Sequence, residues 1–264
     1  MTTEAGARPP AITLPVVVFV LATLTFSVGL LALQEPASVD QNLISLVQFG
    51  PALGAATVAL AFRRSRRWAF RLVTGLRRAP FRGVVPAVAA VVLLAATAGI
   101  AAAAGIPLSV AGLGDVGPPV AALLVAQFVG ACGEELGWRC LLQPTLRLRA
   151  GPVTTGLTVG LLWGAWHVQV FALGPLFVAG FLAGTVGMSV LLAVLLDADG
   201  TPVLIGAGIF HFLVNIGLLV LGDEESGDPG PVLALGGAAL ALAALVVLLT
   251  RRRSGAAGLE RSAR

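Results

Sequence analysis

The sequence predicts an all-α protein, a polytopic transmembrane bundle of about eight helices. Of its 264 residues, 57% are hydrophobic and only 11% are charged, whereas a soluble domain carries about 25% charged residues. The apolar residues gather into runs of about 20, the length that a helix needs to cross the hydrocarbon core of a bilayer. The chain has too little polar surface for a water-soluble globule, so its predicted surroundings are the lipid bilayer.

Eight runs of suitable length occur along the chain. The fourth contains Pro118 and Pro119, which suit the first turn of a helix. The fifth and sixth are separated only by Leu173, Gly174 and Pro175, so their shared boundary is the least defined. The predicted spans are 12–33, 43–62, 84–104, 118–142, 152–172, 175–196, 201–221 and 231–250.

Arginine is concentrated on one side of these spans. The loop 63–83 holds eight arginines, and others lie in the loop 143–151 and after residue 250. With eight spans, all three basic segments share the side of the N-terminus. Basic loops stay in the cytoplasm, so we predict a multi-pass protein of the cell (plasma) membrane with both termini cytoplasmic. Because the arginines lie between apolar spans and not on a soluble face, they do not indicate nucleic-acid binding.

The basic segment 63–82 allows two interpretations. Trp68, Leu72 and Leu76 recur there at helical spacing among the arginines, which is typical of an amphipathic helix lying on lipid headgroups. A basic loop without regular structure fits equally well, and both interpretations stay open.

Five ionisable residues interrupt the predicted spans: Glu134, Glu135, Arg139, His167 and His211. Such side chains are costly inside a membrane and commonly functional. The two histidines are the only ones in the chain. These five residues are therefore the first candidates for a functional site.

Spacing indicates which of the polar side chains face one another. Glu135 and Arg139 are four residues apart, so they share a helix face and can form an ion pair. Glu134 points about 100° away around the helix and is left free. His211 and Asn215 also share a face. The simpler alternatives are that Arg139 reaches the membrane surface, and that His211 and Asn215 only bond to neighbouring helices.

This set of side chains can support peptide hydrolysis. Glu134 would act as general base toward a water that His167 orients. His211 and Asn215 would donate hydrogen bonds to the tetrahedral oxyanion. This mechanism requires no cofactor. A zinc ion held by Glu134, His167 and His211 is a chemically possible alternative, although the chain lacks an HExxH motif.

Three motifs occur in order along the chain. They read Glu134-Glu135-Leu-Gly-Trp-Arg139, Trp163-Gly-Ala-Trp-His167 and His211-Phe-Leu-Val-Asn215. This series resembles the CPBP family, which comprises the CAAX prenyl endopeptidases and their bacterial relatives and is also called the Abi family. The resemblance covers about 118–221. It implies a single membrane domain, 1–264, with N-terminal helices at 12–104, a CPBP-like core at 118–221 and a C-terminal helix at 231–250 with a basic tail.

The resemblance also implies an activity, that of an intramembrane endopeptidase acting on a membrane-associated peptide or protein. Such proteins are often described as metalloproteases. Carried over, the catalytic residues are Glu134, His167, His211 and Asn215, and the supporting residues are Glu135 and Arg139. Phe is more usual in the family at the position of Trp163, and another aromatic side chain there is expected to be harmless.

Two other functions use the same features. A catalytically silent membrane scaffold or immunity protein would keep the helices in order to bind a partner. A proton-coupled transporter would use Glu134 and the histidines as a relay, although no inverted repeat is visible in the sequence. Convergence of Glu134, His167, His211 and Asn215 around one water-sized cavity would favour the peptidase.

The topology can be tested with a reporter that is active on only one side of the membrane. Fused after Arg264, it is expected to read as cytoplasmic, because every arginine-rich segment shares that side. The same reporter inserted after Asp228 is the control and is expected to read as extracytoplasmic. The reverse result would contradict the number of spans.

Overall fold

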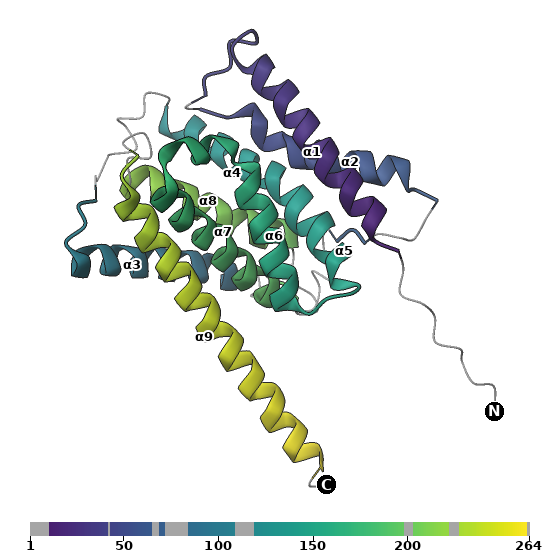
Figure 1. Ribbon diagram of the computed structural model, residues 1–264, viewed down its shortest axis with the longest axis vertical. Coiled ribbons are helices and arrows are strands. Elements are labelled where there is room, and N and C mark those ends of the chain that lie inside the picture. The colour runs from purple at the N-terminus through teal and green to yellow at the C-terminus, as the bar shows by residue number, and fades with distance from the viewer. Residues whose placement is uncertain are drawn as a thin grey trace.

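The structure, a computed structural model, describes residues 11–41, 43–64, 69–71, 84–108, 119–197, 203–221 and 227–262, with the side chains of 253–262 excepted. Every regular element in these residues is a helix, so the predicted all-α polytopic bundle is confirmed. Figure 1 shows the α1–α2 pair along one edge of the bundle and α9 extending beyond the other helices.

Six helical segments in the described residues are long and apolar enough to cross a membrane. A helix of 20 residues is about 30 Å long, which matches the hydrocarbon core. The six are α1 (Thr13–Gln34), α3 (Val84–Ala104), the continuous segment Val120–Arg147, α7 (Pro175–Leu195), α8 (Val203–Leu221) and the apolar part, Pro229–Arg252, of α9 (Pro229–Ser262).

The second and fifth predicted spans are shorter than expected. In place of one helix at 43–62, the chain forms a 3-10 helix, η1 (Leu46–Phe49), and then α2 (Gly50–Ala61). In place of one helix at 152–172, it forms α6 (Pro152–Trp166), which has 15 residues. Hydropathy placed both predicted boundaries, and hydropathy does not detect a change in backbone geometry within an apolar run.

The end of α6 is set by His167, whose φ of −78° and ψ of 66° are not helical. Its ring atom Nδ1 lies 2.9 Å from the carbonyl oxygen of Trp163, and its backbone N–H donates to the carbonyl of Gly164 at 3.3 Å. Carbonyls at a helix end need partners of this kind. The histidine therefore caps the helix, and the 3-10 helix η5 (Val168–Leu173) follows it.

The fourth membrane segment contains a π-helical turn. It is built from α4 (Val120–Gly137), η4 (Trp138–Leu142) and α5 (Gln143–Arg147). Pro144 has no N–H to offer the carbonyl of Cys140, four residues earlier. That carbonyl instead accepts the backbone N–H of Arg71 at 2.8 Å. The proline thereby provides a docking point for a segment more than 60 residues away in the sequence.

Most of the basic segment 63–82 lies outside the described residues, so the two interpretations of it both remain. The described parts, 63–64 and 69–71, are not helical. Ala69 donates its N–H to the hydroxyl oxygen of Thr145 at 3.2 Å, and the hydroxyl donates to the carbonyl of Ala69 at 3.0 Å. This short stretch is therefore held against α5.

Two helices occupy the middle of the bundle. α4 packs against α2 and α8, while α7 packs against α6 and α9. The close approach of α6 to α7 requires Gly156 and Gly160, because a Cβ at either position would lie 2.5 Å from the Cα of Val190 or Val186. Small residues allow such backbone approach in membrane bundles.

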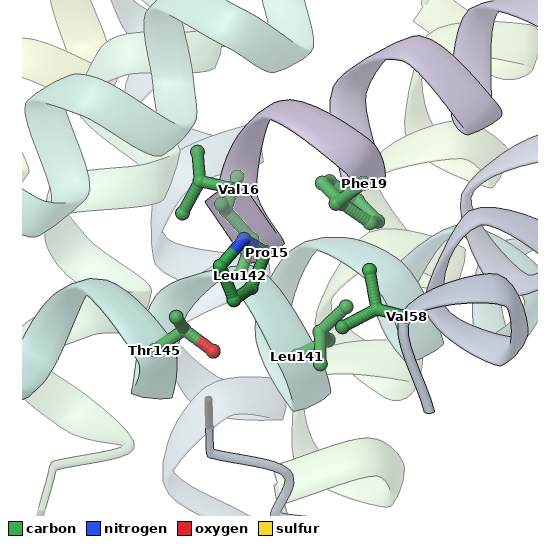
Figure 2. Close-up of a pocket in the computed structure, with 7 residues that line it drawn as sticks. All are labelled: Pro15, Val16, Phe19, Val58, Leu141, Leu142 and Thr145. Carbon is green, nitrogen blue, oxygen red and sulfur yellow. The ribbon is translucent and has the colours of Figure 1, made fainter. Parts of the chain in front are cut away.

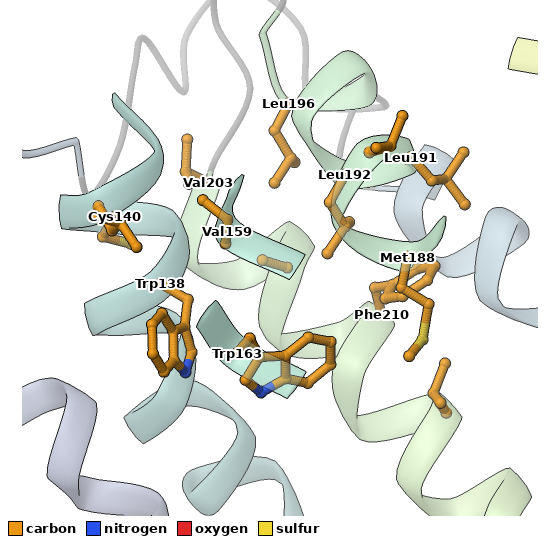
Figure 3. Close-up of a cluster of buried hydrophobic side chains, with 14 of the residues drawn as sticks. Trp138, Cys140, Val159, Trp163, Met188, Leu191, Leu192, Leu196, Val203 and Phe210 are labelled. Atoms are coloured by element: carbon orange, nitrogen blue, oxygen red, sulfur yellow. The ribbon is translucent and has the colours of Figure 1, made fainter. Parts of the chain in front are cut away.

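The interior of the bundle is apolar and closely packed. Figure 3 shows Trp138, Trp163, Met188 and Phe210 meeting from η4, α6, α7 and α8 among aliphatic side chains. A small apolar pocket lies where α1 and α2 meet η4 and α5 (Figure 2). On the outside, Leu21 of α1 is 58% exposed, as expected of a surface that faces lipid.

Candidate active site

Glu134 lies on α4, and its carboxylate is held by donors from two other elements. Nε1 of Trp163 on α6 donates to Oε2 at 2.8 Å. Nε2 of Gln48 in η1 donates to Oε1 at 3.3 Å. Glu134 is only 3% exposed, and a buried charge without partners is costly. Glu134 is therefore not left free, as helix spacing alone suggested, but is bonded to α6 and η1.

The predicted Glu135–Arg139 pair is present. Nη1 of Arg139 donates to Oε1 of Glu135 at 3.2 Å, and both side chains are fully buried. Nη2 donates to the hydroxyl of Ser189 on α7 at 3.0 Å. Cζ lies 4.4 Å from the ring centre of Trp163, within the range of a cation–π contact. The alternative in which Arg139 reaches the membrane surface is therefore wrong.

His211 joins α8 to this ion pair. Its Nδ1 lies 2.8 Å from Oε1 of Glu135. An ionised carboxylate can only accept a hydrogen bond, so Nδ1 carries a proton. Nε2 lies 4.0 Å from Oε1 of Glu134, which is too far for a direct hydrogen bond. Glu134 therefore lies toward Nε2 of the ring and Glu135 toward Nδ1, and only Glu135 accepts a direct hydrogen bond from the ring.

His167 approaches the same centre from the end of α6. Its Nδ1 faces the carbonyl of Trp163, which only accepts, so the neutral ring has its lone pair on Nε2. The ring packs edge-on against Trp166 and Phe181, with centroids 4.8 and 5.0 Å away. Trp163, which bonds to Glu134, also packs edge-on against both imidazoles, with ring centroids 5.8 Å from His167 and 5.2 Å from His211. Glu134 and both histidines of the chain are thus brought together.

Asn215 lies on α8, one turn beyond His211, and is half-buried. Within the described residues, its side chain makes no hydrogen bond to another residue. The alternative in which this amide only joins neighbouring helices therefore has no support from those residues. Its N–H group remains available for a bound substrate.

Two partners in the site, Gln48 and Ser189, are absent from the sequence prediction. Gln48 and Ser189 give only a weak signal, that of a polar residue within an apolar span. The sequence predicts that Trp163, in place of the more usual Phe, is harmless. The structure adds a role for it, because its indole N–H bonds to Glu134 and a Phe side chain has no such donor. Sequence spacing does not relate residue 48 to 134, and tertiary packing alone brings them together.

The zinc alternative would place Glu134, His167 and His211 around one ion. Across the described part of the chain, no group of three or more His, Cys, Asp and Glu side chains is arranged to hold a metal ion. Nδ1 of each histidine is engaged by a carbonyl or a carboxylate, and a zinc-bound histidine commonly has its second nitrogen engaged in this way. The zinc alternative therefore stays a prediction.

Residues 116–217 match the family model described as type II CAAX prenyl endopeptidase Rce1-like. The similarity of this core is to the CAAX-protease family. The resemblance inferred from the three ordered motifs is confirmed, and the motifs all fall within the matched CAAX-protease core. The match covers less than half of the chain, and α1, α2, α3 and α9 lie outside it. None of the curated proteins compared with the chain matches it.

Removing one member of the buried ion pair is expected to destabilise the fold. Arg139→Leu leaves Glu135 buried without its cation, which costs about 3–5 kcal/mol. Thermal unfolding of the purified protein in detergent measures the loss. Ser189→Ala removes only one hydrogen bond of the guanidinium and is expected to cost less, about 1.5–3 kcal/mol. An Arg139→Leu protein of normal stability that lacks activity would place Arg139 in the reaction.

Proposed function

We propose that this protein is an intramembrane endopeptidase of the CAAX-protease type. The observation that carries the proposal is the convergence on Glu134. Trp163 donates to its carboxylate and packs against the rings of His167 and His211, and Nε2 of His211 lies 4.0 Å from its Oε1, although these residues are far apart in the sequence. The family match supports a protease in general terms.

In the proposed mechanism, Glu134 is the general base. It takes a proton from a water molecule, whose oxygen attacks the carbonyl carbon of the scissile peptide bond. Nε2 of His167 accepts the other proton of that water in a hydrogen bond and so orients it. When the tetrahedral intermediate collapses, the C–N bond breaks and Glu134 returns the proton to the leaving amine.

His211 and Asn215 are the proposed donors to the oxyanion. Asn215 offers an amide N–H that no described residue occupies. Nδ1 of His211 is engaged by Glu135, so His211 can donate from Nε2 only as the imidazolium, which has an N–H on both nitrogens. The negative charges of Glu134 and Glu135 on the two sides of the ring attract such a cation.

The proposed substrate is a membrane-associated peptide or protein, because the candidate residues lie on helices of a bilayer-spanning bundle. The proposed setting is the plasma membrane with both termini in the cytoplasm. No metal or other cofactor takes part in the proposed mechanism.

The role of Glu134 can be tested with Glu134→Gln, which keeps the shape of the side chain and removes the proton acceptor. Cleavage of a membrane-tethered peptide library by the purified protein is expected to fall by at least about 100-fold, the usual contribution of a positioned general base. Gln41→Glu, at an exposed position, is a control for an exchange of amide and carboxylate. Full activity in Glu134→Gln would reject the mechanism. No cleavage by the unaltered protein would favour a silent scaffold.

Metal dependence can be tested with a chelator. Hydrolysis is expected to continue in phenanthroline, because Glu134 and His167 are proposed to activate water directly. The measurement is the cleavage rate after incubation with the chelator and after its removal. A loss that returns only on addition of zinc would instead assign a metal to Glu134, His167 and His211.

A further inference from the structure

The carboxylate of Glu134 receives one hydrogen bond on each oxygen, and the two donors come from distant parts of the chain. Trp163 donates to Oε2 from α6. Gln48 donates to Oε1 from η1, a segment outside the 116–217 family match. The terminal torsion of a Glu side chain is broad, so a single donor leaves the carboxylate plane poorly defined. Two donors on separate elements define it.

We infer that Gln48 is a positioning residue, which with Trp163 holds the Glu134 carboxylate in the orientation needed to take a proton from water. The inference rests on the proposed peptidase function. It adds the α1–α2 pair to a site whose other members lie in the CAAX-protease core. Gln48 acts through Glu134 and takes no part in bond making or breaking.

The surface of α4 is shaped to admit the Gln48 side chain. An ideal Cβ on Gly130 would lie 2.2 Å from Oε1 of Gln48, 2.8 Å from its Cδ and 3.1 Å from its Nε2. Contacts under 3.0 Å force a displacement, so any residue other than glycine at 130 would push this amide away. All the nearest atoms to that Cβ belong to Gln48, which means that the empty space at Gly130 serves this one side chain.

The backbone on either side of Gln48 is also held against α4. A Cβ on Gly133 would lie 2.9 Å from Cδ1 of Phe49, and one on Gly137 would lie 2.6 Å from the carbonyl oxygen of Pro51. Gly133 lies three residues after Gly130, and Gly137 lies four residues after Gly133, so the three glycines share one helix face. η1 and the start of α2 therefore lie directly on the turn of α4 that carries Glu134.

A second glutamine holds the connection that leads into η1. Gln34, at the end of α1, is only 4% exposed. Its Nε2 donates to the carbonyls of Val39 and Ile44 at 2.8 and 3.1 Å, and its Oε1 accepts the N–H of Leu46 at 2.7 Å. Buried backbone groups need such partners. The position of η1, and hence of Gln48, is thereby fixed relative to α1.

The first experiment compares Gln48→Met with wild type on one peptide that the wild-type protein cleaves. Met has nearly the length of Gln but no N–H to donate. We expect kcat to fall by about 10- to 100-fold, the rate equivalent of one hydrogen bond to a charged group, with KM little changed. Trp163→Phe keeps an aromatic ring beside Arg139, removes the other donor, and is expected to show the same pattern. Gln41→Met is the control.

The second experiment displaces Gln48 without changing it. Gly130→Ala is expected to lower kcat as Gln48→Met does. In a Gln48→Ala background, the same Gly130→Ala change is expected to have no further effect, because the atoms that it would strike are gone. Gly99→Ala, where a Cβ meets nothing within 4 Å, is the matched control for a helical Gly→Ala change.

The results separate this inference from the proposed function. Wild-type kcat in Gln48→Met, or a Gly130→Ala effect of equal size in both backgrounds, would overturn the positioning role while leaving Glu134 as the base. If Gln48→Met fails to fold, the second experiment still tests the positioning role. An equal loss of kcat on Gly130→Ala in the wild-type and Gln48→Ala proteins would then overturn that role. Full activity in Glu134→Gln would remove the proposed function itself.

Discussion

Charge neutralisation inside an apolar bundle is the constraint on which the rest of this structure depends. Glu135 and Arg139 are fully buried, and breaking such a pair is far more costly than forming it is favourable. The pair also has outer partners, because Arg139 bonds to Ser189 and stacks on Trp163, while Glu135 bonds to His211. One ion pair therefore ties α4 and its π turn to α6, α7 and α8.

Adjacent carboxylates take different roles because their neighbours differ. Glu135 faces a permanent cation and an imidazole, so its lone pairs are used to hold the helices together. Glu134, one position earlier, meets two neutral donors and a gap of 4.0 Å toward His211. Glu134 has no guanidinium to neutralise, which is why we propose that Glu134, and not Glu135, exchanges a proton with water.

Departures from regular helix bring the polar groups together. α6 ends at His167, which caps it with its own ring, and so the imidazole lies at a helix end and not in the middle of a span. The π turn Trp138–Leu142 contains Arg139, and Pro144 beyond it frees the carbonyl of Cys140 for the N–H of Arg71. Turns of this type occur often at functional sites.

The sequence by itself determined the class of the protein, the approximate positions of its helices and the motif residues. Hydropathy reports which segments prefer lipid, and four-residue spacing reports which side chains share one helix face, as for Glu135 and Arg139. Neither property contains information about distance between helices. Only the tertiary structure decided that Trp163 and Gln48 bond to Glu134, that Ser189 accepts a hydrogen bond from Arg139, and that α6 stops at His167. Those contacts depend on the close approach of backbones at glycines such as Gly130 and Gly160, and a linear pattern of apolar residues does not encode such an approach.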